Sequence, residues 1–198
     1  LEACGLESVR LMLSARPPHR PAPVAAVELR LAMLQAATAG ESRLIVDERE
    51  LRRPGPSYTV DSLGSLRAEM GAARPLCLLL GADAFLGLTS WHRWRDILGL
   101  AHLVVMRRPG WRVQPAGELA DLLAARRDDD LAALRRPGGG VIRVQEVTAL
   151  DISASAIREH VYRGGDPRFL TPDPVRDLIL STGCYREPPG PQEAQLRA

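Results

Sequence analysis

Residues 76–83 read L-C-L-L-L-G-A-D, and the apolar run that opens this stretch decides the fold class. Five consecutive apolar residues are typical of a strand buried on both faces of a parallel sheet. Ligands of such sheets bind beyond the carboxyl ends of the strands, where Gly81 and Asp83 follow. Gly81 permits close approach of the backbone, and the Asp83 carboxylate can accept hydrogen bonds from a ribose. Asp83 could equally be the N-cap of the next helix.

Short apolar runs and helical patterns alternate through the rest of the chain. Four more strands are predicted, at residues 9–13, 44–46, 103–106 and 141–144. Helices are predicted at residues 91–98, 152–162 and 174–181, around Val27, Leu31 and Leu34, and around Val60, Leu63 and Leu66. The alternation predicts an α/β fold, a Rossmann-like, doubly wound parallel sheet. We expect one domain over residues 1–186, with a peripheral helical insertion at 111–140, and a disordered tail at 187–198.

The composition excludes several classes of protein. The chain has 198 residues, of which 45% are hydrophobic and 25% charged, and its net charge of +2 indicates neither a nucleic-acid nor a membrane partner. No apolar run approaches the roughly 18 residues of a membrane-spanning helix. Cys4, Cys77 and Cys184 are too scattered for a disulfide framework or a zinc site, and they indicate a reducing cytoplasm. Because the chain has no lysine, phosphate contacts must come from Arg, Ser, Thr, His or backbone N–H groups.

Residues 151–158, D-I-S-A-S-A-I-R, follow the last predicted strand and open a helix. Asp151 or Ser153 can cap this helix, and Ser153 and Ser155 lie in its first turn. Free N–H groups and the helix dipole attract anions there, and Arg158, one turn further on, has a bidentate fork suited to phosphate. The stretch is therefore predicted to bind the phosphates of a nucleotide. The alternative is a plain serine-capped amphipathic helix.

The loop Pro17-Pro18-His19-Arg20 directly follows the first predicted strand. Its proline pair stiffens the backbone, so that His19 and Arg20 point at whatever the strand end holds. An imidazole and a guanidinium together can stabilise the charge of phosphates. The alternative is an ordinary surface loop.

Two aromatic motifs are candidate sites for a ring and a carboxylate. Trp91, in Thr89-Ser90-Trp91-His92, offers a flat π face to a heteroaromatic ring, although tryptophan is more often a core residue. Of Trp91 and Trp94, we expect Trp94 to be the core residue. Pro56-Ser57-Tyr58-Thr59 precedes a predicted helix, whose first N–H groups and hydroxyls can hold a carboxylate. Ordinary capping by Ser57 or Thr59 is the alternative.

Seven motifs follow one another along the chain in a specific order. They are Pro17-Pro18-His19-Arg20, Asp47-Glu48-Arg49-Glu50-Leu51, Pro56-Ser57-Tyr58-Thr59, Gly81-Ala82-Asp83, Trp91, Arg107-Arg108-Pro109-Gly110 and the I-S-A-S-A-I-R of residues 152–158. In this order and spacing the chain resembles bacterial nicotinate-nucleotide adenylyltransferases from Leu6 to Arg186. Each motif is modest by itself, whereas their joint order is highly specific.

The resemblance implies an enzyme that joins nicotinate mononucleotide to the AMP part of ATP, with Mg²⁺, giving deamido-NAD and pyrophosphate. For ATP it implies phosphate contacts from Ser153, Ser155 and Arg158, a ribose contact from Asp83, close approach at Gly81, and Arg108 near the adenine. It implies that His19 and Arg20 lie at the reacting phosphates. It also implies that Trp91 stacks on the pyridine ring and that the helix start at Tyr58 and Thr59 receives the nicotinate carboxylate. The partners are thus ATP and nicotinate mononucleotide, with no dedicated protein ligand for the metal, and the chain is a monomer or a homo-oligomer.

One diagnostic element of that family is missing from the sequence. It is a glycine-rich strand end followed by His-x-Gly-His near the N-terminus, whose histidines are central to catalysis; none of His19, His92, His102 and His160 forms such a pair. We expect the chain to be a fragment without the first central strand, and its catalysis to be impaired. His92 also stands where the family often has a second aromatic. The alternatives are another acceptor, nicotinamide mononucleotide or phosphopantetheine, and a non-catalytic nucleotide-binding remnant.

Overall fold

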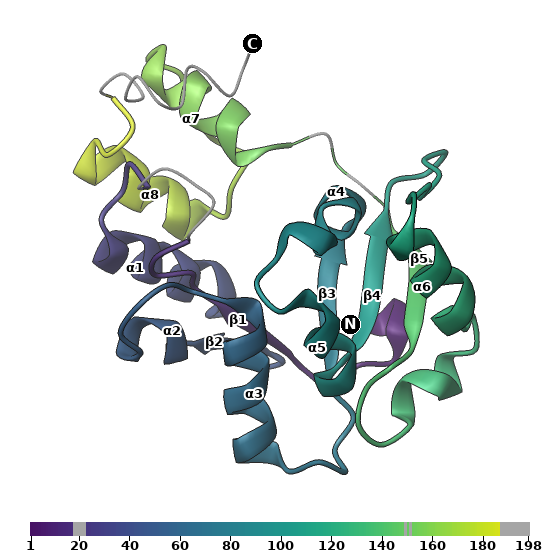
Figure 1. The fold of residues 1–198 in the computed structure, drawn as a ribbon. Helices are drawn as coiled ribbons and strands as arrows, with labels where there is room; N and C mark the ends of the chain where they lie inside the picture. The colour runs from purple at the N-terminus through teal and green to yellow at the C-terminus, as the bar shows by residue number, and fades with distance from the viewer. Residues whose placement is uncertain (18–22, 149, 151, 187–198) are drawn as a thin grey trace. The chain divides into compact units, whose positions relative to one another are not determined.

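The computed structural model describes residues 1–17, 23–148, 150 and 152–186 (Figure 1). Five strands lie within these residues, and each pairs in parallel with its neighbours, as the sequence predicts. The chain groups into two compact units, one made of Leu1–Leu6 and Tyr58–Ala149, the other of Glu7–Ser57 and Leu150–Ala198. We call them the three-stranded and the two-stranded unit. The prediction of one domain over residues 1–186 stays a prediction.

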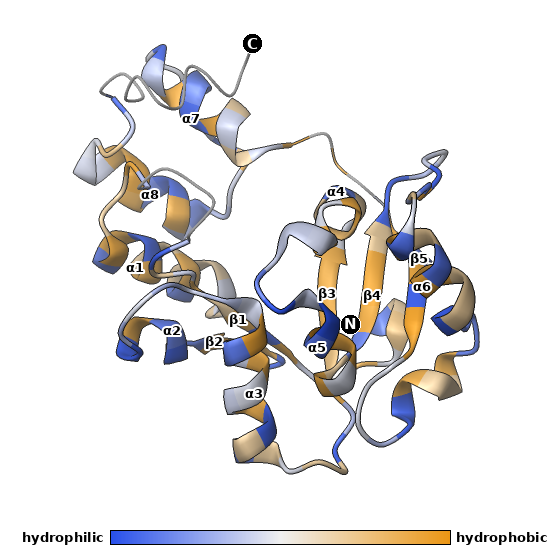
Figure 2. Ribbon diagram, in the orientation of Figure 1, coloured by the Kyte–Doolittle hydropathy of each residue, from blue (hydrophilic) through white to orange (hydrophobic). Residues whose placement is uncertain are grey.

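The three-stranded unit has the strand order β3-β4-β5. Its elements are η1 (Glu2–Cys4), α3 (Thr59–Met70), β3 (Cys77–Gly81), α4 (Ala82–Leu86), η2 (Leu88–Ser90), α5 (Trp94–Leu100), β4 (His102–Arg107), α6 (Glu118–Arg126), η3 (Leu131–Arg135) and β5 (Ile142–Glu146). Figure 2 shows β3 and β4 as predominantly hydrophobic strands. The first four residues of β4 are buried, because this strand has a neighbour on both edges. The uninterrupted apolar runs thus mark the covered strands, as expected.

The core of this unit is built from apolar side chains of strands and helices together. Seven of them are completely buried: Phe85, Leu88, Ile97, Ala101, Leu103, Val105 and Ile142. Trp94 is also buried, with the Arg95 guanidinium 4.7 Å from the centre of its ring, so the expectation that Trp94 is the core tryptophan is confirmed.

His102, a fully buried side chain at the start of β4, is satisfied on both ring nitrogens. Its Nδ1 accepts a hydrogen bond from the Val141 N–H at 3.2 Å, and its Nε2 donates to the Arg136 carbonyl at 3.1 Å. Because a carbonyl only accepts, the two contacts fix a neutral tautomer with the proton on Nε2. His102 therefore ties β4 to the segment that leads into β5.

The two-stranded unit pairs β1 (Val9–Met12) with β2 (Leu44–Asp47). Its helices are α1 (Val27–Thr38), α2 (Arg49–Arg52), α7 (Ala154–Tyr162) and α8 (Asp173–Thr182). Helices α1 and α8 lie against each other, and Val161, Val175 and Ile179 form an apolar cluster with Met33 and Ala36 of α1 (Figure 1). The phosphate-binding candidate α7 thus shares its core with α1 and α8.

Most elements lie where the sequence predicts them. The strand bounds agree to within one or two residues, and the predicted insertion at 111–140 contains helices α6 and η3. The helix predicted at 91–98 begins only at Trp94, because Arg93 has a left-handed backbone, with φ 50°. The short helices α2, α4 and η2 were not predicted, since three to five residues carry no helical period. The predicted tail at 187–198 lies outside the described residues.

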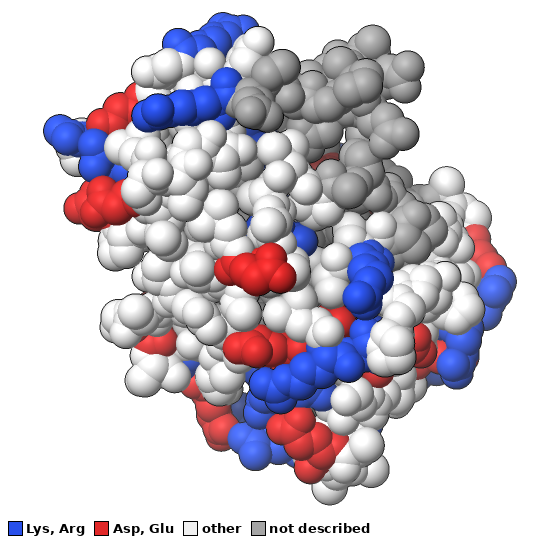
Figure 3. Space-filling model, turned by 90° about the vertical axis from the view of Figure 1, so that its left-hand side faces the viewer, with Lys and Arg blue, Asp and Glu red and all other residues white. Residues whose placement is uncertain are grey.

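The surface agrees with the balanced composition. Arginine side chains intermix with Asp and Glu over the face drawn in Figure 3. No helix in the described part of the chain is both long and apolar enough to cross a membrane.

Candidate functional site

The carboxyl end of β3 carries Gly81 and Asp83. Gly81 is the N-cap of α4 and has an extended backbone (φ −69°, ψ 158°), and a β-carbon on it would meet no described atom within 4 Å. The fold itself therefore does not require glycine at this position. Asp83 lies in the first turn of α4 and is exposed, and its carboxylate has no hydrogen-bond or ion-pair partner within the described residues. Since Asp83 is not the N-cap, the capping alternative is wrong.

The adjacent strand end is organised by Arg107. Gly81 lies opposite Met106 in the register, so the ends of β3 and β4 are neighbours. Arg107 donates from Nη2 to Glu146 Oε2 of β5 at 2.8 Å, and from Nη1 to the Trp111 carbonyl at 2.7 Å. Arg107 thereby links the end of β4 to β5 and to the turn that follows β4.

Arg108 opens a tight turn beyond that strand end. The Trp111 N–H donates to the Arg108 carbonyl at 3.1 Å, and Gly110 between them has a φ of 77°. Proline at the second position and a left-handed glycine at the third are the signature of a type II turn. Arg108 is exposed at the start of this turn.

The start of α3 lacks a side-chain cap. Its N-cap is Tyr58, which makes no capping hydrogen bond, and Thr59 is the first helical residue. The Ser57 hydroxyl is used elsewhere, as an acceptor for backbone N–H groups of Ala15 and Arg16. The alternative of ordinary capping by Ser57 or Thr59 is therefore wrong. The first N–H groups of a helix have no partner within it, so this end can receive an anion.

Trp91 and His92 follow η2 and belong to the same unit as Tyr58. The imidazole of His92 stacks on the Tyr58 ring, with 4.2 Å between the ring centres and 29° between the planes. Trp91 is half-buried with an extended backbone (φ −78°, ψ 146°), and so it is not a core residue like Trp94. The structure thus brings the Trp91-His92 segment to the start of α3. His92 is the contact that sequence reasoning did not predict.

Ser153 is the N-cap of α7. Its Oγ accepts a hydrogen bond from the Ala156 N–H at 3.1 Å, so the serine-capped helix of the sequence analysis is present. Ser153 and Ser155 are exposed, and Arg158 donates from Nη2 to Ser155 Oγ at 3.2 Å. Capping leaves the hydroxyl proton of Ser153 free to donate, because Oγ acts there only as an acceptor. The helix therefore presents two hydroxyls and a guanidinium beside its N-terminus.

The remaining predicted residues are His19, Arg20 and Asp151, and all three lie outside the described residues. The candidates that are described fall into two groups. Gly81, Asp83, Arg108, Tyr58, Thr59 and Trp91 belong to the three-stranded unit, whereas Ser153, Ser155 and Arg158 belong to the two-stranded unit. Within the described residues, no three His, Cys, Asp or Glu side chains gather as they would around a metal ion.

Comparison with known proteins identifies the family. A family model described as cytidylyltransferase-like matches residues 2–160. A Pseudomonas putida protein named "Probable nicotinate-nucleotide adenylyltransferase" is 48% identical over 187 residues, which cover 94% of this chain and 85% of the relative. A Pseudomonas aeruginosa protein of the same name is 46% identical, with coverage of 94% and 87%. The chain belongs to the nicotinate-nucleotide adenylyltransferases of the cytidylyltransferase-like family.

Solved structures share the fold of this chain. The Plasmodium falciparum nicotinic acid mononucleotide adenylyltransferase complexed with NaAD aligns with a TM-score of 0.64 at 12% identity, over 91% of this chain and 83% of that one. The same enzyme complexed with APC aligns with a TM-score of 0.61 at 13% identity. At such low identity the likeness supports the fold and not the individual site residues.

Proposed function

We propose that the protein transfers the adenylyl group of ATP to nicotinate mononucleotide, giving deamido-NAD and pyrophosphate in the synthesis of NAD. The observation that carries this proposal is the 46–48% identity, over 187 residues, to relatives named for that activity. The free Cys4, Cys77 and Cys184 suit a reducing compartment, and we place the reaction in the cytoplasm.

The chemistry asks for placement more than for proton transfer. The nucleophile is a phosphate monoester, which is mostly dianionic near pH 7 because its second pKa is about 6. One of its oxygens bonds to the α-phosphorus of ATP, while the bond from that phosphorus to the bridging oxygen breaks and pyrophosphate leaves. No general base is needed. The acceptor phosphate, the α-phosphate of ATP and the departing pyrophosphate are all anionic, and they must be held in line against their mutual repulsion. Arginine, serine and backbone N–H groups are suited to that task.

For ATP we propose contacts from residues that the family resemblance assigns to the nucleotide. Ser153, Ser155 and Arg158 at the start of α7 bind the phosphates. Asp83, whose carboxylate has no partner among the described residues, accepts hydrogen bonds from the ribose, and the open space at Gly81 admits the nucleotide. Arg108, at the corner of its turn, lies on the adenine side. His19 and Arg20 are proposed at the reacting phosphates on the resemblance alone.

For the acceptor we propose a site at the start of α3. The uncapped N–H groups of Thr59 and Val60 receive the nicotinate carboxylate, and Trp91 stacks on the pyridine ring. A carboxylate offers only acceptors to these donors, whereas an amide also turns an NH₂ donor toward them. This difference favours nicotinate over nicotinamide mononucleotide.

Mg²⁺ enters the proposal as part of the substrate MgATP. Magnesium is commonly held by the phosphates of a nucleotide together with water, and it needs few protein ligands. It would neutralise charge on the departing pyrophosphate. The site residues proposed here contact the nucleotide itself.

The test is pyrophosphate release by the protein expressed from its complete reading frame, with MgATP and one acceptor at a time. We expect kcat/KM to be roughly a hundredfold higher with nicotinate than with nicotinamide mononucleotide, because a mismatched amide leaves donors unpaired. Equal kcat/KM values for the two mononucleotides would contradict the proposed acceptor specificity. If pyrophosphate were released only with phosphopantetheine, phosphopantetheine would be the acceptor in place of nicotinate mononucleotide. A protein that binds MgATP but releases no pyrophosphate with any acceptor would be the non-catalytic remnant.

A further inference from the structure

The stack between His92 and Tyr58 is a contact that the proposed function does not use. The two ring centres lie 4.2 Å apart, with 29° between the planes. Two aromatic rings at this separation attract each other beyond the effect of the apolar area that they bury. The His92 imidazole makes no hydrogen bond and no ion pair with any described residue. Stacking on Tyr58 is therefore the contact through which this side chain can act on the site.

Tyr58 places its ring at the start of α3. The Tyr58 carbonyl accepts hydrogen bonds from the N–H groups of Asp61 and Ser62, both at 3.2 Å, which closes the first turn of the helix. The N–H groups of Thr59 and Val60 come before these two, and they are the donors that the proposed function gives to the nicotinate carboxylate. A ring that packs on Tyr58 therefore packs on the residue that begins the proposed carboxylate site.

A tight turn couples His92 to Trp91. The Trp94 N–H donates to the Trp91 carbonyl at 3.2 Å, and His92 and Arg93 lie between these two residues. Arg93 has a left-handed backbone, with φ 50° and ψ 39°, and its guanidinium pairs with the Asp96 carboxylate at 2.7 Å. Because Trp94 is buried, one end of the turn is attached to the core. In a turn closed in this way, the position of His92 also limits the position of Trp91.

The two helices that follow these rings are packed together. Helix α3 contacts α5, and Arg67 of α3 donates from Nε to the carbonyl of Leu100, the last residue of α5, at 2.6 Å. The Arg67 contact thus joins the later turns of the two helices. The stack of His92 on Tyr58 joins their beginnings, so the pair is held at both ends.

The acceptor requires a fixed spacing between two parts of its site. In nicotinate the carboxylate is bonded directly to the pyridine ring, so the group that stacks and the group that accepts hydrogen bonds cannot move apart. Trp91 and the first N–H groups of α3 can bind both groups only when their separation matches the ligand. A protein that already holds this separation loses less conformational entropy when the ligand binds.

We propose that His92 is a positioning residue of the acceptor site: its imidazole, stacked on Tyr58, fixes the spacing between Trp91 and the first turn of α3. The proposal rests on the proposed function, which gives the pyridine ring to Trp91 and the carboxylate to the N–H groups of α3. In this role the side chain must be a flat ring, whereas its hydrogen-bonding nitrogens are not required.

The test compares His92→Ala with His92→Phe, which keeps a flat ring, and with Ser181→Ala as control, in the protein expressed from its complete reading frame. Within the described residues, the Ser181 hydroxyl bonds only to carbonyls of its own helix, Asp177 and Leu178. In His92→Ala we expect the KM for nicotinate mononucleotide to rise roughly threefold to tenfold, as for the loss of an aromatic pair, while the KM for ATP stays within about twofold. His92→Phe should restore the acceptor KM, and Ser181→Ala should change neither KM. An acceptor KM that is unchanged in His92→Ala, or as high in His92→Phe as in His92→Ala, would overturn the proposal.

A double-mutant cycle shows whether His92 acts through Tyr58. Tyr58→Leu removes the stack from the other side and keeps an apolar side chain. In the Tyr58→Leu background, His92→Ala should change the acceptor KM by less than about twofold, because the contact between the two side chains is already lost. An equal rise in both backgrounds would mean that His92 acts on the acceptor without Tyr58, and the positioning role would be wrong.

NMR tests the stack without any turnover. Protons that lie over the face of an aromatic ring are shielded, so the carbon-bound protons of the His92 imidazole should shift downfield in Tyr58→Leu. Unshifted resonances would show that the stack is absent in solution and would overturn the proposal. If His92→Ala does not fold, His92→Gln replaces it in the kinetic experiments, because glutamine is polar but has no ring. The same rise in the acceptor KM is expected, and an unchanged KM would overturn the proposal.

The two proposals fail in different ways. A wild-type protein that releases no pyrophosphate with nicotinate mononucleotide overturns the proposed function, and the positioning role with it. A wild-type protein that releases pyrophosphate, together with an unchanged acceptor KM in His92→Ala, overturns the positioning role alone.

Discussion

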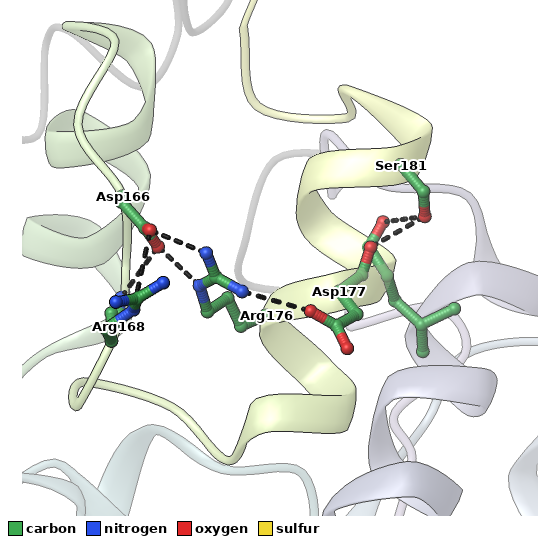
Figure 4. Close-up of polar contacts among 6 residues, drawn as sticks. Asp166, Arg168, Arg176, Asp177 and Ser181 are labelled. Carbon is green, nitrogen blue, oxygen red and sulfur yellow. Dashed lines mark hydrogen bonds and ion pairs between the residues drawn. The ribbon is translucent and has the colours of Figure 1, made fainter.

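Asp166 and Arg176 face each other in a bidentate ion pair, with 2.6 Å from Arg176 Nε to Asp166 Oδ1 and 2.6 Å from Nη2 to Oδ2 (Figure 4). Asp166 also accepts a hydrogen bond from the Arg168 N–H at 3.1 Å. The pair joins the loop that follows α7 to the side of α8. The ion pair therefore holds the chain just after α7, the helix whose N-terminus is the proposed phosphate site.

We expect Asp166→Asn to lower Tm near pH 7 and to have a progressively smaller effect as the pH falls below 3.8. The hydrogen bonds from Arg176 hold the pKa of the Asp166 carboxyl below its ordinary value of 3.8. A lowered folded-state pKa stabilises above the unfolded value, and this contribution is lost as pH falls through the folded value. Thermal melts of wild type and variant from pH 7 downward check this. A difference in Tm that grows toward low pH would refute the assignment.

Arg158→Ala should weaken the use of ATP more than the use of the acceptor. Loss of a guanidinium–phosphate contact costs about 1.5–3 kcal/mol, so the KM for ATP should rise roughly tenfold or more. Steady-state kinetics with each substrate varied in turn measure the effect. Arg163→Ala is the matched control, because Arg163 is on the same segment but pairs with Glu159 at 2.7 Å. If only the acceptor KM rises, α7 is not the phosphate helix.

Gly81→Val should impair ATP binding without unfolding the protein. A β-carbon at Gly81 meets no described atom within 4 Å, and the proposal gives the space beyond it to the nucleotide. We expect Tm to stay within a few degrees and the dissociation constant of MgATP, measured by calorimetry, to rise at least about tenfold. Gly64→Ala inside α3 is the control: its new methyl also meets no described atom, and alanine should stabilise that helix by about 0.5–1 kcal/mol. Unchanged affinity in Gly81→Val would remove Gly81 from the site.

His102→Ala should destabilise the three-stranded unit. It leaves the buried Val141 N–H and the part-buried Arg136 carbonyl without their partner, and an unsatisfied buried group costs about 1–3 kcal/mol. Urea unfolding should show a loss of at least about 2 kcal/mol. His160→Ala is the comparison, since the His160 ring is exposed and bonds a single carbonyl, that of Asp166. A similar, small loss in both variants would mean that the two contacts of His102 add little.

The strands and long helices could be predicted from the sequence because their signal is local. The run at residues 76–80 is apolar throughout, and α3 repeats Val60, Leu63 and Leu66 at helical spacing, so both were found. The stacking of His92 on Tyr58 and the binding of Ala15 by Ser57 join residues 34 and 42 positions apart, and no local pattern encodes such pairs. Chemistry-bearing residues were thus identified by type and position, whereas their partners required the fold.

Because the three tryptophans differ in burial, their intrinsic fluorescence can report on separate parts of the protein. Trp94 is sealed in the core and Trp111 is 49% exposed, while Trp91 is half-buried beside the proposed acceptor site. A protein carrying Trp94→Phe and Trp111→Phe would emit from Trp91 alone. Stacking of a pyridine ring on that indole would quench the emission, so occupancy of the acceptor site could be followed by fluorescence without any label.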